Sequence, residues 1–233
     1  MKRPGRVVVA VLFAAVVAAP EARAQGALQE KLAAAKQAAA TNQQALRSYS
    51  WIEKTQLSLR GEVKNEKIEQ CRYGPDGTVQ KTLLSSPPEP PQKKRGVRGR
   101  VIAKKTGEMK AEMEAATALV HQYLPPAPDK MQVVMNAGTA SLAQAGPGAV
   151  ALRFPGYLKA GDSLTLTFGS AIKALQRVDV DTWLDDPSNR VGLKIELQSL
   201  PDGTNYPATT MLSIPARQIE VRIANSSYQK VAN

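Results

Sequence analysis

The sequence predicts an α+β protein with a curved antiparallel sheet of about seven strands and helices packed on one face. Three observations support this fold class. Apolar and polar residues alternate with a period of two in several segments, as in half-buried strands. Gly-Pro-Asp-Gly, Asp-Asp-Pro and Pro-Asp-Gly turn signals separate these segments, which favours hairpins over crossovers. Stretches of good helix formers precede and interrupt the strands.

The first part of the chain predicts one helix followed by a three-stranded meander. Residues 27–47 are rich in Ala, Gln, Lys, Glu and Leu and contain no Gly or Pro, so we expect a helix. Residues 49–60 then alternate with a period of two, and Gly61 supplies a turn. We expect a second, more polar strand over 62–73 and a third over 78–84.

The middle of the chain predicts a loop and a second helix. A run of prolines begins at Pro87 and basic residues follow it, so we expect a Pro-rich, basic loop over 85–105. A helix is expected over 106–124, because its apolar residues cluster on one side of a 3.6-residue wheel. Prolines from Pro125 onward end it. Residues 130–148 are rich in Ala, Gly and Met and receive no assignment.

The last part of the chain carries the clearest strand patterns. Strands are expected over residues 163–168, 178–184, 191–198 and 218–223. Together with the meander they give about seven strands, enough for one domain over residues 25–233 with a substantial core.

The N-terminus predicts a secretory signal peptide. Lys2, Arg3 and Arg6 precede an uncharged run over 7–19, and Ala22-Arg23-Ala24 forms a small-x-small cleavage site. The run is too short to span a bilayer, and an uncleaved anchor is the alternative. We therefore expect cleavage after Ala24 and a soluble periplasmic or secreted protein without a transmembrane segment.

Composition argues against several kinds of site. One Cys and one His exclude an internal disulfide and leave little for a zinc site, and we expect neither a metal nor another cofactor. The Asp residues over 179–186 lack the glycine that a helix-loop-helix calcium loop requires. Cys71 is expected to be a small buried hydrophobe, and His121 a half-buried structural residue on the flank of its helix. We expect no catalytic residue and no enzyme; the alternative is a hydrolase whose site the sequence does not reveal.

A cluster of basic residues follows the prolines. No aromatic residue interleaves with them, which argues against nucleic acid as a partner. They are candidates for contact with anionic lipid, an envelope polymer or a protein partner; the alternative is a mobile solvated loop. The candidate anion-binding residues are Lys93, Lys94, Arg95, Arg98 and Arg100.

Aromatic and apolar residues of the first expected strand share one face. Met and Tyr residues of the 106–124 helix are expected to pack toward that face, and methionine suits varied apolar ligands. An apolar cavity between sheet and helix is one interpretation, and an ordinary core is the other. The candidate ligand-binding residues are Tyr49, Trp51, Leu57, Leu59, Met109, Met113 and Tyr123.

Over about residues 27–84, the sequence resembles the start of periplasmic lipoprotein-carrier (LolA-like) domains. The resemblance lies in the order of the elements: a signal peptide, an Ala/Gln-rich helix, a Tyr-Ser-Trp strand and a Tyr-Gly-Pro-Asp-Gly hairpin. This resemblance implies an incomplete antiparallel barrel whose concave face holds acyl chains. The C-terminal half is similar to uncharacterised exported bacterial proteins. The expected function is non-enzymatic binding of acyl chains or lipidated proteins in an apolar cleft, and the alternative is an envelope interaction module that acts through the basic loop.

Overall fold

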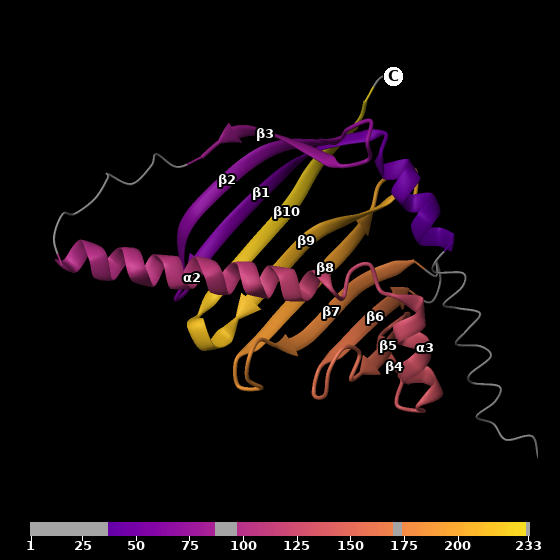
Figure 1. Ribbon diagram of the computed structural model, residues 1–233. Helices are drawn as coiled ribbons and strands as arrows, with labels where there is room; N and C mark the ends of the chain where they lie inside the picture. The colour runs from indigo at the N-terminus through magenta and orange to yellow at the C-terminus, as the bar shows by residue number, and fades with distance from the viewer. Residues whose placement is uncertain (1–36, 87–96, 170–173, 232–233) are drawn as a thin grey trace, which may run out of the picture.

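A single open antiparallel sheet forms most of the structure, a computed structural model that describes residues 37–86, 97–169 and 174–231 (Figure 1). The ten strands lie in the order β3-β2-β1-β10-β9-β8-β7-β6-β5-β4. Their bounds are β1 (Tyr49–Leu59), β2 (Glu62–Tyr73), β3 (Val79–Ser85), β4 (Ser141–Gly146), β5 (Ala149–Pro155), β6 (Ser163–Gly169), β7 (Leu175–Trp183), β8 (Arg190–Ser199), β9 (Asn205–Ile214) and β10 (Ile219–Lys230).

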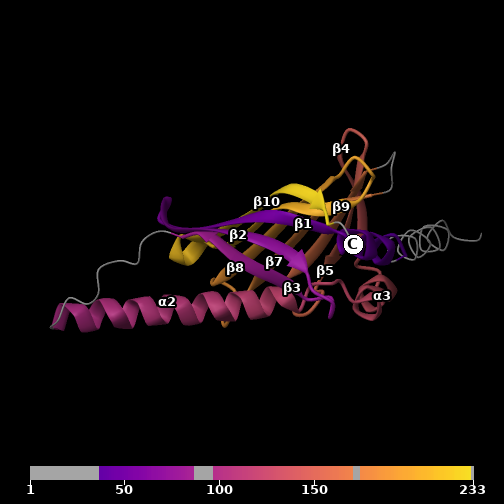
Figure 2. The ribbon, with the colours of Figure 1, turned by 90° about the horizontal axis from the view of Figure 1, so that it is seen from above.

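Two helices lie on the same face of the sheet, as Figure 2 shows. They are α2 (Val97–His121) and the short α3 (Pro128–Asn136). We call the face that they cover the inner face and the opposite one the outer face. Residues 37–46 form a further helical segment before β1, and η1 (Pro215–Arg217) is a single 3-10 turn between β9 and β10.

The hydrophobic core lies between the inner face and the helices. Strands β5 to β8 contribute alternating apolar side chains, such as Phe154, Leu164 and Val191, which are almost fully buried. Ala116 and Val120, in the C-terminal half of α2, pack onto them. The outer face carries the intervening polar residues, so the alternation that predicted the strands also determines which side is buried.

The sheet has more strands than the sequence predicted. The expected segments were found, but β4, β5 and β9 were missed. The residues of β4 are small and weakly patterned, so they carry little β signal. Strand β9 contains Pro207, a residue that weakens a strand pattern; it lies opposite Leu197, where the register of β8 and β9 shifts, and such irregularities tolerate proline within a sheet.

The middle of the chain also differs from the expectation. Helix α2 begins at Val97, so residues 97–105 are helical rather than part of a loop. This segment has no proline, and Lys, Arg and Ala are good helix formers that outweigh the cost of Gly99. Of the candidate anion-binding residues, Arg98 and Arg100 therefore lie in α2. His121, expected to be half-buried, is exposed at the last position of α2. The unassigned residues 130–148 contain most of α3 and all of β4.

Several expectations concern residues outside the described ranges. These are the signal peptide over 1–24, the first ten residues of the predicted 27–47 helix, the prolines after Pro87, and the basic residues Lys93, Lys94 and Arg95. Within the ranges that the structure describes, no helix is both long and apolar enough to cross a bilayer.

Candidate functional site

Apolar side chains of the inner face are incompletely covered where the core reaches β1 and β10. They pack against the buried core, yet each keeps an intermediate exposure. We call this set the inner strip: Leu57 and Leu59 of β1, Ile195 and Leu197 of β8, Val221 of β10, and Met109 and Met113 of α2. Strands β1, β10, β9 and β8 are neighbours in the sheet, so the strip crosses its centre.

Helix α2, which contributes Met109 and Met113 to the strip, is attached to the rest of the protein near its middle. Toward its middle, α2 is held by one acidic residue: Glu112 forms an ion pair with Arg217 of η1 (Oε2 to Nε, 2.8 Å) and accepts a hydrogen bond from Asn189 Nδ2 (3.3 Å). The Glu112 side chain is 16% exposed and the Arg217 side chain is 60% exposed, so only the carboxylate end of this contact is shielded from water. We call it the Glu112 clasp.

The N-terminal part of α2 extends past the ends of the strands (Figures 1 and 2). From Ala103 to Glu108 every side chain is exposed. The basic residues Arg100, Lys104 and Lys105 lie there, and Lys104 forms a long i,i+4 ion pair with Glu108 (3.9 Å). This part of α2 is thus a positively charged arm beside the inner face.

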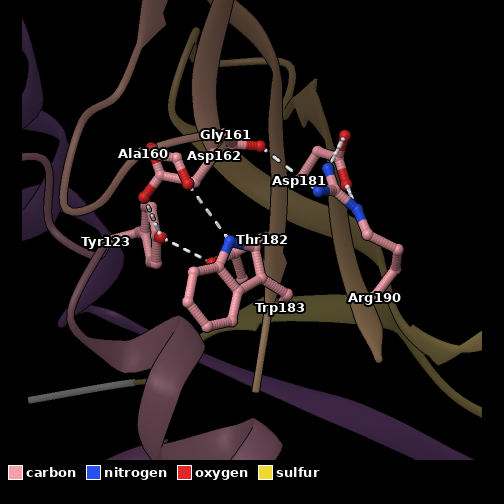
Figure 3. Close-up of polar contacts among 8 residues, drawn as sticks. All are labelled: Tyr123, Ala160, Gly161, Asp162, Asp181, Thr182, Trp183 and Arg190. Carbon is pink, nitrogen blue, oxygen red and sulfur yellow. Dashed lines mark hydrogen bonds and ion pairs between the residues drawn. The ribbon is translucent and has the colours of Figure 1, made fainter. Parts of the chain in front are cut away.

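The chain after α2 is anchored by a buried polar network (Figure 3). The fully buried Tyr123 donates a hydrogen bond to Asp162 Oδ2 (2.5 Å), and its oxygen lies 2.8 Å from Thr182 Oγ1. Asp162 also accepts hydrogen bonds from the backbone N–H groups of Leu158 and Lys159. Burial, and next the hydrogen bond to the Asp162 carboxylate, raise the pKa of Tyr123, so the phenol remains a donor.

The loop that carries Asp162 is itself fixed to β7. Trp183 donates through Nε1 to the carbonyl of Ala160 (3.2 Å), as Figure 3 shows. The Lys159 ammonium lies 3.7 Å from the centre of the Trp183 ring and binds backbone carbonyls of β7 and the residue after it. Arg190 pairs with Asp181 and donates to the Gly161 carbonyl. The end of α2 is therefore rigidly held, unlike its exposed beginning.

Aromatic rings gather on the inner face near the start of β1. Trp51 stacks on Tyr228 of β10 with ring centres 5.6 Å apart and nearly parallel planes, and it contacts Tyr73 at 5.5 Å. Tyr49 and Tyr206 also pack against Tyr228. Trp51 is buried, and its Nε1 has no hydrogen-bond partner among the described residues. The rings fill this region by packing on one another.

Two buried glutamates face each other beside the aromatic rings. Glu53 of β1 is directly opposite Glu69 of β2, and Cys71 is opposite Trp51. Lys81 neutralises Glu53 (2.5 Å) and Lys67 neutralises Glu69 (2.6 Å). Burial, with smaller contributions from nearby charges, raises the pKa of the Cys71 thiol to about 11. Each of the two glutamates is thus paired with one lysine. The described residues contain no cluster of three or more acidic, His or Cys side chains arranged to hold a metal ion.

The candidate ligand-binding residues fall into three separate places. Leu57, Leu59, Met109 and Met113 come together in the inner strip. Tyr49 and Trp51 belong to the aromatic group, and Tyr123 is enclosed by the Asp162 network. The strip residues Ile195, Leu197 and Val221 were not predicted as site residues. Their alternation with polar residues had nevertheless placed each of them on the apolar face of its expected strand. The Glu112 clasp depends on Arg217, which is 105 residues further along the chain, and no sequence signal indicated it.

Three of the four acidic residues over 179–186 have local partners. Asp179 pairs with Arg177, Asp181 with Arg190, and Asp186 accepts hydrogen bonds from Ser188. These contacts account for the acidic stretch over 179–186 as ordinary strand and turn structure.

Comparisons with known proteins give one structural neighbour. The chain matches no family model, and no curated protein matches its sequence. A crystal structure of a DUF1329 family protein from Desulfovibrio piger aligns with a TM-score of 0.39 and 9% sequence identity, covering 86% of this chain and 93% of that one. This likeness is too weak to support a statement about function, which must therefore come from the geometry.

Proposed function

We propose that this is an exported, non-enzymatic protein that binds an acyl chain, or the lipid part of a lipidated protein, on the inner strip beside α2. The observation that carries the proposal is the incomplete burial of seven apolar side chains, five on the inner face of the sheet and two on α2. Ordinary cores bury such residues, whereas a site for an apolar ligand leaves them accessible. The sequence resemblance of residues 27–84 to lipoprotein-carrier domains favours the same class of ligand.

The attachment of α2 suits a covering element that admits a ligand. Its C-terminal end is fixed by the Tyr123 network, its middle by the Glu112 clasp, and its first turns extend beyond the strands. Release of the clasp would let α2 move about its anchored end and uncover the inner strip. Met109 and Met113, with their flexible side chains, would adapt to the shape of an acyl chain.

The test compares two methionine substitutions on α2 with a matched control. Met109→Gln and Met113→Gln keep the length of the side chain and add no charge, while Ala111→Gln makes the same residue on the exposed side of the helix. Each half-buried methionine contributes about 1 kcal/mol of apolar contact, so we expect the double variant to bind a fluorescent fatty acid roughly thirtyfold more weakly. The control should bind like the unmodified protein.

Native mass spectrometry followed by lipid extraction supplies an independent readout. A co-purifying acyl species, reduced in the double methionine variant and retained in the Ala111→Gln control, is the expected result. A clean unliganded mass together with no displacement of the fluorescent probe would refute the proposal.

The charged arm of α2 supports a second candidate function, contact with an anionic envelope surface. Arg100, Lys104 and Lys105 are exposed, and a basic patch near an anionic bilayer gains about 1 kcal/mol per Lys or Arg. Binding to vesicles that contain anionic lipid should weaken with salt and with Lys104→Gln/Lys105→Gln. Equal binding to neutral vesicles would exclude this role of the arm.

A further inference from the structure

An open recess of about 390 Å³ lies where the β1–β2 turn meets η1 and the start of β10. Figure 1 shows the indigo turn and the yellow η1 side by side at this end of the sheet. The recess is remote from the Asp162 network, and the inner strip does not contribute to it. Its polar lining includes Ser58, Arg60, Ser213, Gln218 and Glu220.

The strand register explains why the surface is hollowed there. Glu220 of β10 is opposite Ser58 of β1 on one side and Ser213 of β9 on the other. The next residue along this row is Gly192 of β8, where even a Cβ atom would lie 2.9 Å from Ser213 Oγ. Small side chains on both sides of Glu220 therefore leave its carboxylate flanked by two hydroxyl groups.

Two residues of the lining adopt a backbone conformation that their residue types disfavour. Arg60 has φ 56° and Gln218 has φ 54°, both in the left-handed region. Gly or Asn occupies such positions at lower cost; Arg60 is the first residue of a two-residue hairpin turn, where these two types prevail. The strained residues are adjacent, because the Arg60 N–H donates to the Gln218 carbonyl (2.8 Å). Strain of this kind concentrates at ligand-binding sites.

The charges of the recess lack partners within the protein. Among the residues that the structure describes, the Arg60 guanidinium and the Glu220 carboxylate have no ion pair or side-chain hydrogen bond. Most other carboxylates of the strands are paired, as Glu53, Glu66 and Asp179 show. The recess thus presents one cation, one anion, two hydroxyl groups and an amide to a single small volume.

We propose that this recess binds a small zwitterion, a free α-amino acid or a dipeptide. Glu220, with the hydroxyl groups of Ser58 and Ser213, would receive the ammonium group. Arg60, with the Gln218 amide, would receive the carboxylate as a planar, bidentate partner. The volume accommodates a ligand of this size with water. The proposal is independent of acyl-chain binding on the opposite face of the sheet.

The test is an NMR titration of the ¹⁵N-labelled purified protein with L-Ala-L-Ala. The expected result is a saturable shift of the amides of Gly61 and Gln218, which line the recess. N-acetyl-L-Ala-L-Ala lacks the ammonium and L-Ala-L-Ala amide lacks the carboxylate, so each should bind about tenfold more weakly, the loss of one charged hydrogen-bonded contact. Shifts of the same size with all three compounds, or none with the dipeptide and with free L-Ala, would overturn the proposal.

Two variants separate binding from a purely structural role. Arg60→Asn relieves the left-handed strain, so it should raise the melting temperature while weakening dipeptide binding about tenfold. Glu220→Gln should weaken binding without changing the circular dichroism spectrum. The matched controls are Arg222→Gln and Glu196→Gln, exposed residues of the outer face that do not line the recess. If Arg60→Asn stabilises the protein and binds the dipeptide as tightly as before, Arg60 is only a turn residue and the proposal fails.

Discussion

Replacing Tyr123 by phenylalanine tests the network that anchors the end of α2. The substitution keeps the ring, which packs on Tyr157 with centres 5.5 Å apart, and removes only the hydroxyl group. That hydroxyl is the hydrogen-bond partner of Asp162, whose side chain is 4% exposed, and of Thr182, which is fully buried. Neither group can reach water in compensation.

The expected cost follows from what each partner loses. A hydrogen bond to a buried carboxylate contributes about 1.5–3 kcal/mol, and an orphaned buried hydroxyl costs about 1 kcal/mol more. Asp162 keeps hydrogen bonds from two backbone N–H groups, at 3.0 and 3.1 Å. The free energy that it loses with the Tyr123 hydroxyl is therefore toward the lower end of that range. We therefore expect Tyr123→Phe to lower the free energy of unfolding by about 3 kcal/mol, a large share of the stability of a single domain.

Urea unfolding with a constant denaturant slope is the assay, with two companion variants. Tyr123→Phe/Thr182→Val should be no less stable than Tyr123→Phe alone, because the second change removes the orphaned hydroxyl. Tyr157→Phe is the control: its hydroxyl accepts only the Ala127 backbone N–H (2.7 Å), and its loss should cost about 1 kcal/mol. Neutral surface substitutions change the free energy of unfolding by up to about 0.5 kcal/mol. If Tyr123→Phe changes it by no more than that, the reasoning is refuted.

Three further changes test other parts of the structure. Glu112→Gln removes the charge that holds Arg217, so amides in the first half of α2 should exchange a few-fold faster in hydrogen-exchange measurements; unchanged exchange would show that the clasp does not hold the helix. Burial raises the pKa of the Cys71 thiol to about 11, so the thiol should react with a disulfide reagent at pH 8 at least a hundredfold more slowly in the folded than in the urea-unfolded protein. For the same reason, the contribution of Cys71 to the free energy of unfolding is complete below about pH 8.5 and declines as the pH rises toward 11. In Gly192→Ala, the added Cβ atom would lie 2.9 Å from the Ser213 hydroxyl oxygen. The change in the free energy of unfolding on Gly192→Ala, measured with urea, should therefore be more favourable by about 1 kcal/mol in a Ser213→Ala background than in the unmodified protein. Equal changes in both backgrounds would contradict that contact.

Much of the sheet could be predicted because alternation reports burial directly. Strand β6, with Leu164 and Leu166 inward and Thr165 outward, is an example. Two of the three missed strands lack this clear signal: β4 is so exposed that its residues need no pattern, and β9 carries Pro207 at a register shift. The third, β5, buries Leu152 and Phe154 on alternate positions, yet four of its other residues are small or weakly patterned. Residues 97–105 were misjudged because charge was taken as a sign of a loop, although lysine and arginine extend a helix at little cost.

The candidate site was predictable only where neighbours in space share a strand or helix. Leu57 with Leu59, and Met109 with Met113, follow local periodicity, and both pairs pack against the same buried core as parts of the inner strip. The neighbours of the other candidate residues on β1 are determined by the pairing of β1 with β10 and β2. This pairing places Trp51 against Tyr228 rather than against Met109 and Met113. Such pairings depend on the order of strands across the sheet, which a single sequence does not state.

The position of β10 has a consequence for how this chain folds. Every pair of neighbouring strands in the sheet is consecutive in the chain except β1 and β10, which join Tyr49 to Lys230 and Leu59 to Ile219. The β1–β3 and β4–β10 segments can each form by local zipping, with small losses of chain entropy. Uniting them closes a loop that spans most of the chain, an unfavourable step repaid by ten residue pairs at once. The two segments should therefore collapse early and separately, and their docking through β10 should limit the rate at which the complete sheet appears.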